Sequence, residues 1–94
     1  MPSPTDILMP NGALIGSPGS DLTIREVPGG AAAAQQMFDE LSVGGKENTP
    51  PGYPGTMVEL PQGTRVGLRP SSKSGPPTID VNFPNVPIRK VKFL

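Results

Sequence analysis

The stretch Thr56–Arg69, TMVELPQGTRVGLR, decides the fold class. Polar and apolar residues alternate on both sides of Pro61-Gln62-Gly63, and this alternation is typical of strands that bury one face. Pro61 fixes its own φ, and Gly63 readily adopts the positive φ of a hairpin turn. The stretch therefore predicts an antiparallel hairpin with strands over 56–60 and 64–69.

The alternation continues toward the C-terminus and predicts two more strands. These are Pro77–Asn82 and Pro87–Leu94, linked by a turn at Phe83-Pro84-Asn85. Alternate side chains point to opposite faces of a sheet, so one set faces a core and the other faces solvent. The expected inward set is Val58, Leu60, Val66, Leu68, Ile79, Val81, Val91 and Phe93, and the expected outward set is Arg65, Gly67, Arg69, Thr78, Asp80, Lys90 and Lys92.

One segment predicts a helix and another predicts an arm. Residues 30–43, GAAAAQQMFDELSV, are rich in helix formers, with apolar residues at the spacing of one helical face, and Gly44 follows as a stop. Residues 1–28 contain five prolines and no sustained periodicity, which indicates a flexible arm or linker. We therefore expect an α+β fold over residues 29–94, an N-terminal helix packed on an antiparallel sheet of about four strands, preceded by a Pro/Gly-rich arm over 1–28.

Missing residue types exclude several function classes. The chain has no cysteine and no histidine. Disulfides, thiol or imidazole catalysis and the usual zinc sites are therefore excluded, and we expect neither a metal nor a cofactor. No apolar run approaches the roughly 20 residues of a membrane span, and MPSPTDILMP does not resemble a signal peptide, so we expect no membrane partner.

The charges are segregated along the chain although the formal net charge is zero. Residues 1–59 contain two basic and seven acidic residues, and residues 60–94 contain six basic residues and one acidic residue. The C-terminal third is therefore the expected anion-binding surface.

The outward set suggests chemistry on RNA. Cleavage needs a base near the 2′-hydroxyl and positive charge around the scissile phosphate, and arginine and lysine supply that charge without histidine. Arg65, Arg69, Lys90 and Lys92 are of the right kind, and Asp80 either acts as the base or fixes an arginine. An ordinary solvated sheet face carries the same residue types, so composition alone leaves both interpretations open.

Two loops add candidates. The loop 71–78, SSKSGPPT, has hydroxyl side chains and a lysine that can surround a phosphate, and Ser71, Ser72 and Thr78 can hold the phosphate or the ribose. Tyr53, the only tyrosine, lies in a Pro/Gly-rich loop where it can stack on a base. The alternatives are a plain connecting loop and a tyrosine that covers the edge of a small core.

The motifs GGAAAAQQMFDEL (29–41), LPQGT (60–64), LRPSSKSGPPTIDV (68–81) and IRKVKF (88–93) resemble the C-terminal toxin modules of bacterial polymorphic and contact-dependent growth inhibition toxins. Such modules are similar to the barnase/EndoU/colicin/RelE ribonuclease superfamily. Because EndoU-like members use paired histidines, the chain resembles the histidine-free branch. The resemblance adds Lys73 to the candidates and supports Arg69, Ser71, Ser72, Thr78, Lys90 and Lys92, whereas Arg65 and Asp80 rest on the face assignment alone.

The resemblance implies a function and partners. It implies a ribonuclease, usually aimed at tRNA, that acts in interbacterial competition. Together with the arginines, lysines and missing histidine, it leads us to expect a metal-independent endoribonuclease that cleaves by transfer to a 2′,3′-cyclic phosphate. It further implies secretion or cell-surface delivery as part of a larger toxin, action in the cytoplasm of the target cell, and a cognate immunity protein, expected to be acidic. The alternative is a non-catalytic interaction module whose basic sheet face binds an acidic protein or nucleic acid.

Overall fold

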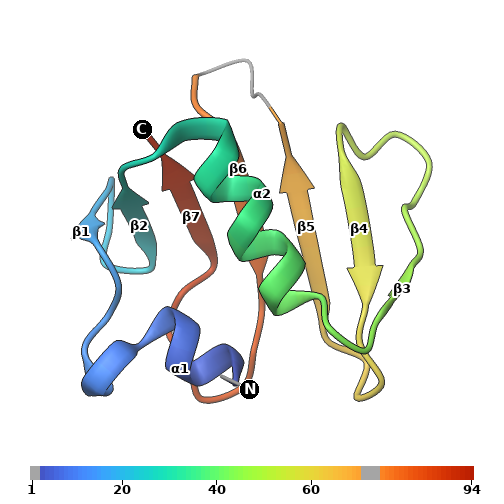
Figure 1. The fold of residues 1–94 in the computed structure, drawn as a ribbon, viewed down its shortest axis with the longest axis horizontal. Helices are drawn as coiled ribbons and strands as arrows, with labels where there is room; N and C mark the ends of the chain where they lie inside the picture. The colour runs from blue at the N-terminus through green and yellow to red at the C-terminus, as the bar shows by residue number, and fades with distance from the viewer. Residues whose placement is uncertain (1–2, 71–74) are drawn as a thin grey trace.

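The computed structural model describes residues 3–70 and 75–94, which form a mixed sheet of seven strands with helix α2 (Gly30–Leu41) lying across one face (Figure 1). A short helix, α1 (Pro4–Leu8), and a 3-10 turn (Pro10–Gly12) precede the first strand. The sheet order is β1-β2-β7-β6-β5-β4-β3, with strands β1 (Ser17–Pro18), β2 (Ile24–Val27), β3 (Lys46–Glu47), β4 (Thr56–Glu59), β5 (Arg65–Arg69), β6 (Thr78–Val81) and β7 (Lys90–Phe93).

The C-terminal strands form where the alternation predicts them. Strands β4 and β5 pair antiparallel, with Val58 opposite Val66. The backbone N–H of Gly63 donates to the Leu60 carbonyl at 2.8 Å and closes the turn, and Gly63 has the expected positive φ of 90°. Strands β6 and β7 continue the antiparallel ladder beside β5.

The expected architecture is nevertheless wrong. The sheet has seven strands instead of about four, it is mixed instead of antiparallel, and α2 follows two strands instead of standing at the N-terminus. The error lies in residues 1–28, because β2 is an interior strand that pairs parallel with β7 and antiparallel with β1. The described part of this segment, residues 3–28, is therefore part of the fold. The prediction of a Pro/Gly-rich arm is wrong.

Helix α1 is short but capped. The Asp6 N–H donates to the Ser3 hydroxyl and the Ser3 N–H donates to the Asp6 carboxylate, both at 3.2 Å, with Pro4 at the first helical position. This capping box satisfies backbone donors that a helix start leaves unpaired. The sequence signal for this cap is Ser-Pro-Thr-Asp at 3–6, with the proline at a position that a helix start tolerates.

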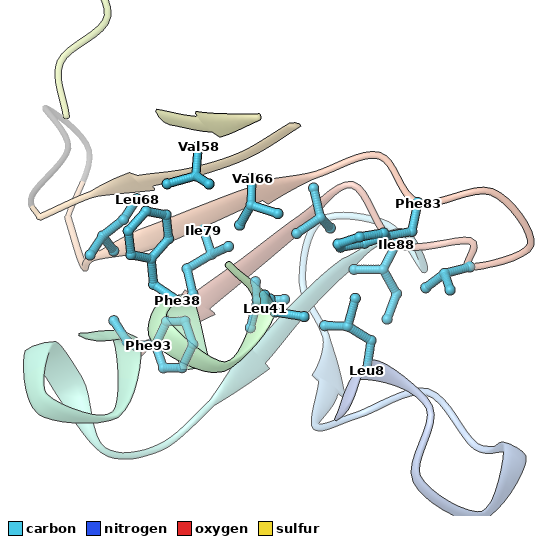
Figure 2. Close-up of a cluster of buried hydrophobic side chains, with 14 of the residues drawn as sticks. Leu8, Phe38, Leu41, Val58, Val66, Leu68, Ile79, Phe83, Ile88 and Phe93 are labelled. Atoms are coloured by element: carbon cyan, nitrogen blue, oxygen red, sulfur yellow. The ribbon is translucent and has the colours of Figure 1, made fainter. Parts of the chain in front are cut away.

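The core lies between the sheet and the helices. All eight side chains of the expected inward set belong to it, together with Ala34, Phe38 and Leu41 from α2 and the completely buried Leu8 from α1. Figure 2 shows Leu8 reaching from α1 toward the cluster that contains Leu41 and Ile88. The first helix is thus fixed by apolar burial as well as by its cap.

Arg25 is a buried cation on the core side of β2, and only 6% of it is exposed. Its guanidinium donates to three backbone carbonyls: Nε to Ile15 at 2.8 Å, Nη1 to Leu22 at 3.1 Å and Nη2 to Gly16 at 3.2 Å. These bonds hold the segment before β2 against the sheet. The planar fork of arginine suits this arrangement, because several donors diverge from one rigid group.

We predict that Arg25→Ala lowers the free energy of unfolding by about 3 kcal/mol, because it removes charge-assisted hydrogen bonds and leaves carbonyls without a partner. Arg65→Ala is the matched control: its ion pair with Glu59 is half exposed, so its removal costs under about 1 kcal/mol. Urea denaturation of both variants measures the difference. Equal stability of the two variants would contradict the structural role of Arg25.

Candidate functional site

The candidate site is the sheet face opposite α2, which we call the open face. The buried residues of both helices pack into the core on the other side, so no described helix covers the open face (Figure 1). Strand register sorts its side chains into rows that run across the strands, because paired residues point to the same side. The first row is Met57, Gly67, Asp80, Lys90 and Ile24, and the second row is Arg69, Thr78, Lys92 and Glu26.

Arg69 and Asp80 form a two-pronged ion pair between neighbouring strands. Arg69 Nε donates to Asp80 Oδ2 at 2.9 Å, and Nη2 donates to Oδ1 at 3.0 Å. The side chains are only 20% and 28% exposed, so this geometry is worth more than a surface ion pair. Of the two roles considered for Asp80, the contacts support the second: it fixes an arginine.

Tyr53 reaches the same carboxylate from the loop between β3 and β4. Its hydroxyl donates to Asp80 Oδ2 at 2.8 Å, which makes Asp80 the centre of a three-residue cluster. The phenol ring crosses β5 at Gly67, where an added Cβ would lie 2.8 Å from Tyr53 Cζ and 3.0 Å from Met57 Cε. Glycine is therefore required at position 67 to let the tyrosine lie against the strand.

The Tyr53 hydroxyl is held in its protonated form. Burial is the largest cause that raises the pKa of Tyr53 above its ordinary value, and the hydrogen bond to the Asp80 carboxylate acts in the same direction. A phenolate base at this position is therefore disfavoured. Tyr53 serves as a hydrogen-bond donor that positions Asp80, and stacking of its ring on a base stays a prediction.

The second row brings together residues that lie far apart in the sequence. Thr78 is paired with Arg69 on one side and with Lys92 on the other, and Lys92 is paired with Glu26 across the parallel β2–β7 ladder. Glu26 was missed because residues 1–28 were interpreted as an arm. Residues 24–27, Ile-Arg-Glu-Val, do not alternate between polar and apolar, so the sequence carries no period-two signal for this strand.

The other expected site residues are placed as follows. Thr78 is buried, and its hydroxyl donates to the Pro76 carbonyl at 3.1 Å, so it supports the loop before β6. Arg65 lies at the far end of β5, with Glu59 at 3.7 Å, away from the second row. Ser71, Ser72 and Lys73 lie outside the described residues.

The fold mixes the charges that the sequence segregates. Acidic residues from the first 59 positions reach basic residues of the C-terminal third: Glu59 meets Arg65, and Asp21 accepts from Arg89 Nη2 at 3.2 Å. The described open face therefore carries three carboxylates beside Lys46, Arg65, Arg69, Lys90 and Lys92, and the expectation of one carboxylate among four cations is wrong. These carboxylates belong to Glu26, Glu59 and Asp80.

Comparison with known proteins finds no relative: no family model, curated protein or solved structure matches this chain. Within residues 3–70 and 75–94, no group of three or more carboxylate, histidine or cysteine side chains is arranged to hold a metal ion. In the same ranges, no helix is long and apolar enough to cross a membrane.

We predict that Tyr53 does not ionise near pH 10, where a free tyrosine is half ionised. A raised pKa in the folded state means that the associated stability is present below the ordinary pKa and is lost as the pH rises beyond it. Ultraviolet absorbance of the phenolate measures the titration directly, since Tyr53 is the sole tyrosine and the chain has no tryptophan.

Gly67→Ala, which displaces the ring, and Asp80→Asn, which removes the negative acceptor, should each return the pKa of Tyr53 toward about 10. Asp39→Asn, an exposed carboxylate on α2, is the control and should leave the titration unchanged. Ionisation of wild-type Tyr53 at the ordinary pH in a folded chain would refute the cluster.

Proposed function

We propose that the chain is an endoribonuclease of the toxin type and that it cleaves RNA on the open face without a metal ion. The observation that carries this proposal is the second row, which places Arg69, Lys92 and Glu26 in line on one face, with Arg69 held by Asp80. The row combines two cations for a phosphate with a carboxylate that can accept a proton.

Arg69 and Lys92 bind the scissile phosphate. They flank Thr78 on the neighbouring strands, so their backbones are two strand spacings apart, about 9.6 Å. Both side chains are long enough to converge on one phosphate above Thr78. The Asp80 pair occupies Nε and one hydrogen of Nη2 and fixes the plane of the guanidinium, which prepares it for the charge of a pentavalent transition state.

Glu26 is the general base. It lies one strand beyond Lys92, on the side away from Arg69, and is half-buried. From this position a carboxylate can take the proton of the 2′-hydroxyl while Lys92 holds the phosphate next to it. Asp80 is less suited to this task, because both of its oxygens already accept hydrogen bonds.

The reaction balances as an internal transfer. The 2′-oxygen forms a bond to phosphorus, the bond from phosphorus to the 5′-oxygen breaks, the 2′-proton goes to Glu26, and Lys90 protonates the leaving oxygen. Lys90 lies two residues from Lys92 on the same face of β7. The nucleophile comes from the substrate itself, so the mechanism needs no metal-bound water, and the product carries a 2′,3′-cyclic phosphate.

The resemblance to polymorphic toxin modules guides the biological part of the proposal. It favours tRNA as the substrate, delivery within a larger protein and a dedicated immunity protein in the producing cell. An acidic immunity protein would block the site by forming ion pairs between its carboxylates and Lys90 and Lys92. The mixed charges of the open face make that recognition depend on close contact more than on long-range attraction.

We predict that Lys92→Ala lowers the rate constant for RNA cleavage about 10²–10³-fold and that Glu26→Gln lowers it about 10²–10⁴-fold. The assay incubates total tRNA with each variant in EDTA and identifies the product ends by mass spectrometry. Lys46→Ala on edge strand β3 and Glu40→Gln on α2 are matched controls that should retain full activity, since both side chains are exposed and away from the second row.

Several outcomes would overturn the proposal. Cleavage of a substrate with a 2′-deoxy nucleotide at the cut site would exclude internal transfer. Full activity in both the Lys92 and Glu26 variants would remove the second row from the mechanism. Binding of RNA by the wild-type chain without any cleavage would favour the alternative, a non-catalytic module that binds nucleic acid.

A further inference from the structure

We propose that a hollow beside Asp80 on the open face is the binding site for one unstacked nucleobase of the RNA substrate. The hollow has a volume of about 270 Å³ and is lined by Met57, Arg65, Asp80, Val81 and Asn82. The inference rests on the proposed function and adds to it a site that selects the nucleotide next to the cut.

The walls of the hollow match a flat heterocycle. Met57 supplies an apolar, polarizable surface at the hollow, and its methyl group lies next to the site where the Tyr53 ring crosses Gly67. Thioethers and guanidinium groups both pack well against aromatic faces, so Met57 and Arg65 can enclose a base from two directions.

The polar groups of the hollow are mostly donors. Asn82 Oδ1 accepts from the Arg65 backbone N–H at 3.3 Å, which assigns the amide so that Nδ2 is its donor end. The Arg65 side chain is half exposed and only loosely paired with Glu59 at 3.7 Å, so its guanidinium can turn to a ligand. A base that presents ring nitrogens or carbonyl oxygens fits this arrangement.

The hollow has the right relation to the proposed phosphate site. Asp80 belongs to both, since it holds Arg69 through two hydrogen bonds and also lines the hollow. Thr78, which marks the phosphate position, precedes Asp80 by two residues on β6, a rise of about 6.6 Å along the strand. A nucleotide can therefore place its phosphate in the second row and its base beyond Asp80, against Met57 and Asn82.

Binding of small ligands tests the hollow independently of cleavage. The fluorescence of Tyr53, the sole tyrosine in a chain without tryptophan, reports on the cluster that borders the hollow. The full chain is titrated with each of the four nucleoside 3′-monophosphates and with inorganic phosphate. We expect the preferred nucleotide to bind about tenfold more tightly than phosphate, as the stacking of one base requires.

The variants separate the base from the phosphate. Asn82→Ala should weaken the nucleotide about three- to tenfold through a lost hydrogen bond and leave the affinity for inorganic phosphate unchanged. Met57→Ala should also weaken the nucleotide alone. The control is Gln36→Ala, an exposed amide on α2 at the other side of the sheet, which should change neither affinity.

The outcomes distinguish this inference from the proposed function. The hollow is not a base-binding site if nucleotides bind no better than phosphate, or if they bind the Asn82 and Met57 variants as tightly as the wild-type chain. Either result would overturn this inference even if tRNA is cleaved. Selective nucleotide binding without tRNA cleavage would overturn the ribonuclease and keep the hollow. If tRNA is cleaved, the Asn82→Ala variant should lose the base preference at the cut site. That result would support both the base-binding hollow and the proposed ribonuclease.

Discussion

The structure depends on the parallel pairing of β2 with β7, which joins the N-terminal third of the chain to its last strand. Four residue pairs make this ladder, from Ile24 opposite Lys90 to Val27 opposite Phe93. The pairing puts Arg25 on the core side, where it binds backbone carbonyls, and puts Glu26 on the open face beside Lys92. Without this ladder the second row would contain no carboxylate.

The sequence predicts the antiparallel strands β4 to β7 because the residues that specify each hairpin lie close together in the chain. Alternation over a few residues, together with Pro61 and Gly63 in the turn, is enough to specify a hairpin and its faces. The parallel strand has no such signal, since its partner is distant in sequence. It also lacks polar and apolar alternation: Ile24 lies with Glu26 on the open face, whereas Arg25 lies with Val27 on the core side. Hydrophobicity alone therefore does not predict which side chains of β2 face the core.

The same distinction explains the candidate site. Period-two alternation placed Arg69, Asp80, Lys90 and Lys92 on one face, and the register agrees with it. It gave no information on side-chain partners that come from elsewhere. The contact between Tyr53 and Asp80 crosses from a loop to a strand, and it is possible because Gly67 has no side chain. A sequence pattern identifies a face, whereas a cluster on that face requires the fold.

The mixing of charges changes how such a site can act. A chain with a basic third and an acidic remainder suggests a strong field that attracts RNA from a distance. The fold instead distributes Asp21, Glu26 and Glu59 among the basic residues, and the formal net charge of the whole chain is zero. Long-range attraction of a polyanion is then weak, and the proposed recognition of RNA must come from contacts made at short range. Short-range recognition in turn requires rigid groups, and Arg69 meets that requirement because Asp80, itself held by Tyr53, fixes its orientation before any substrate arrives.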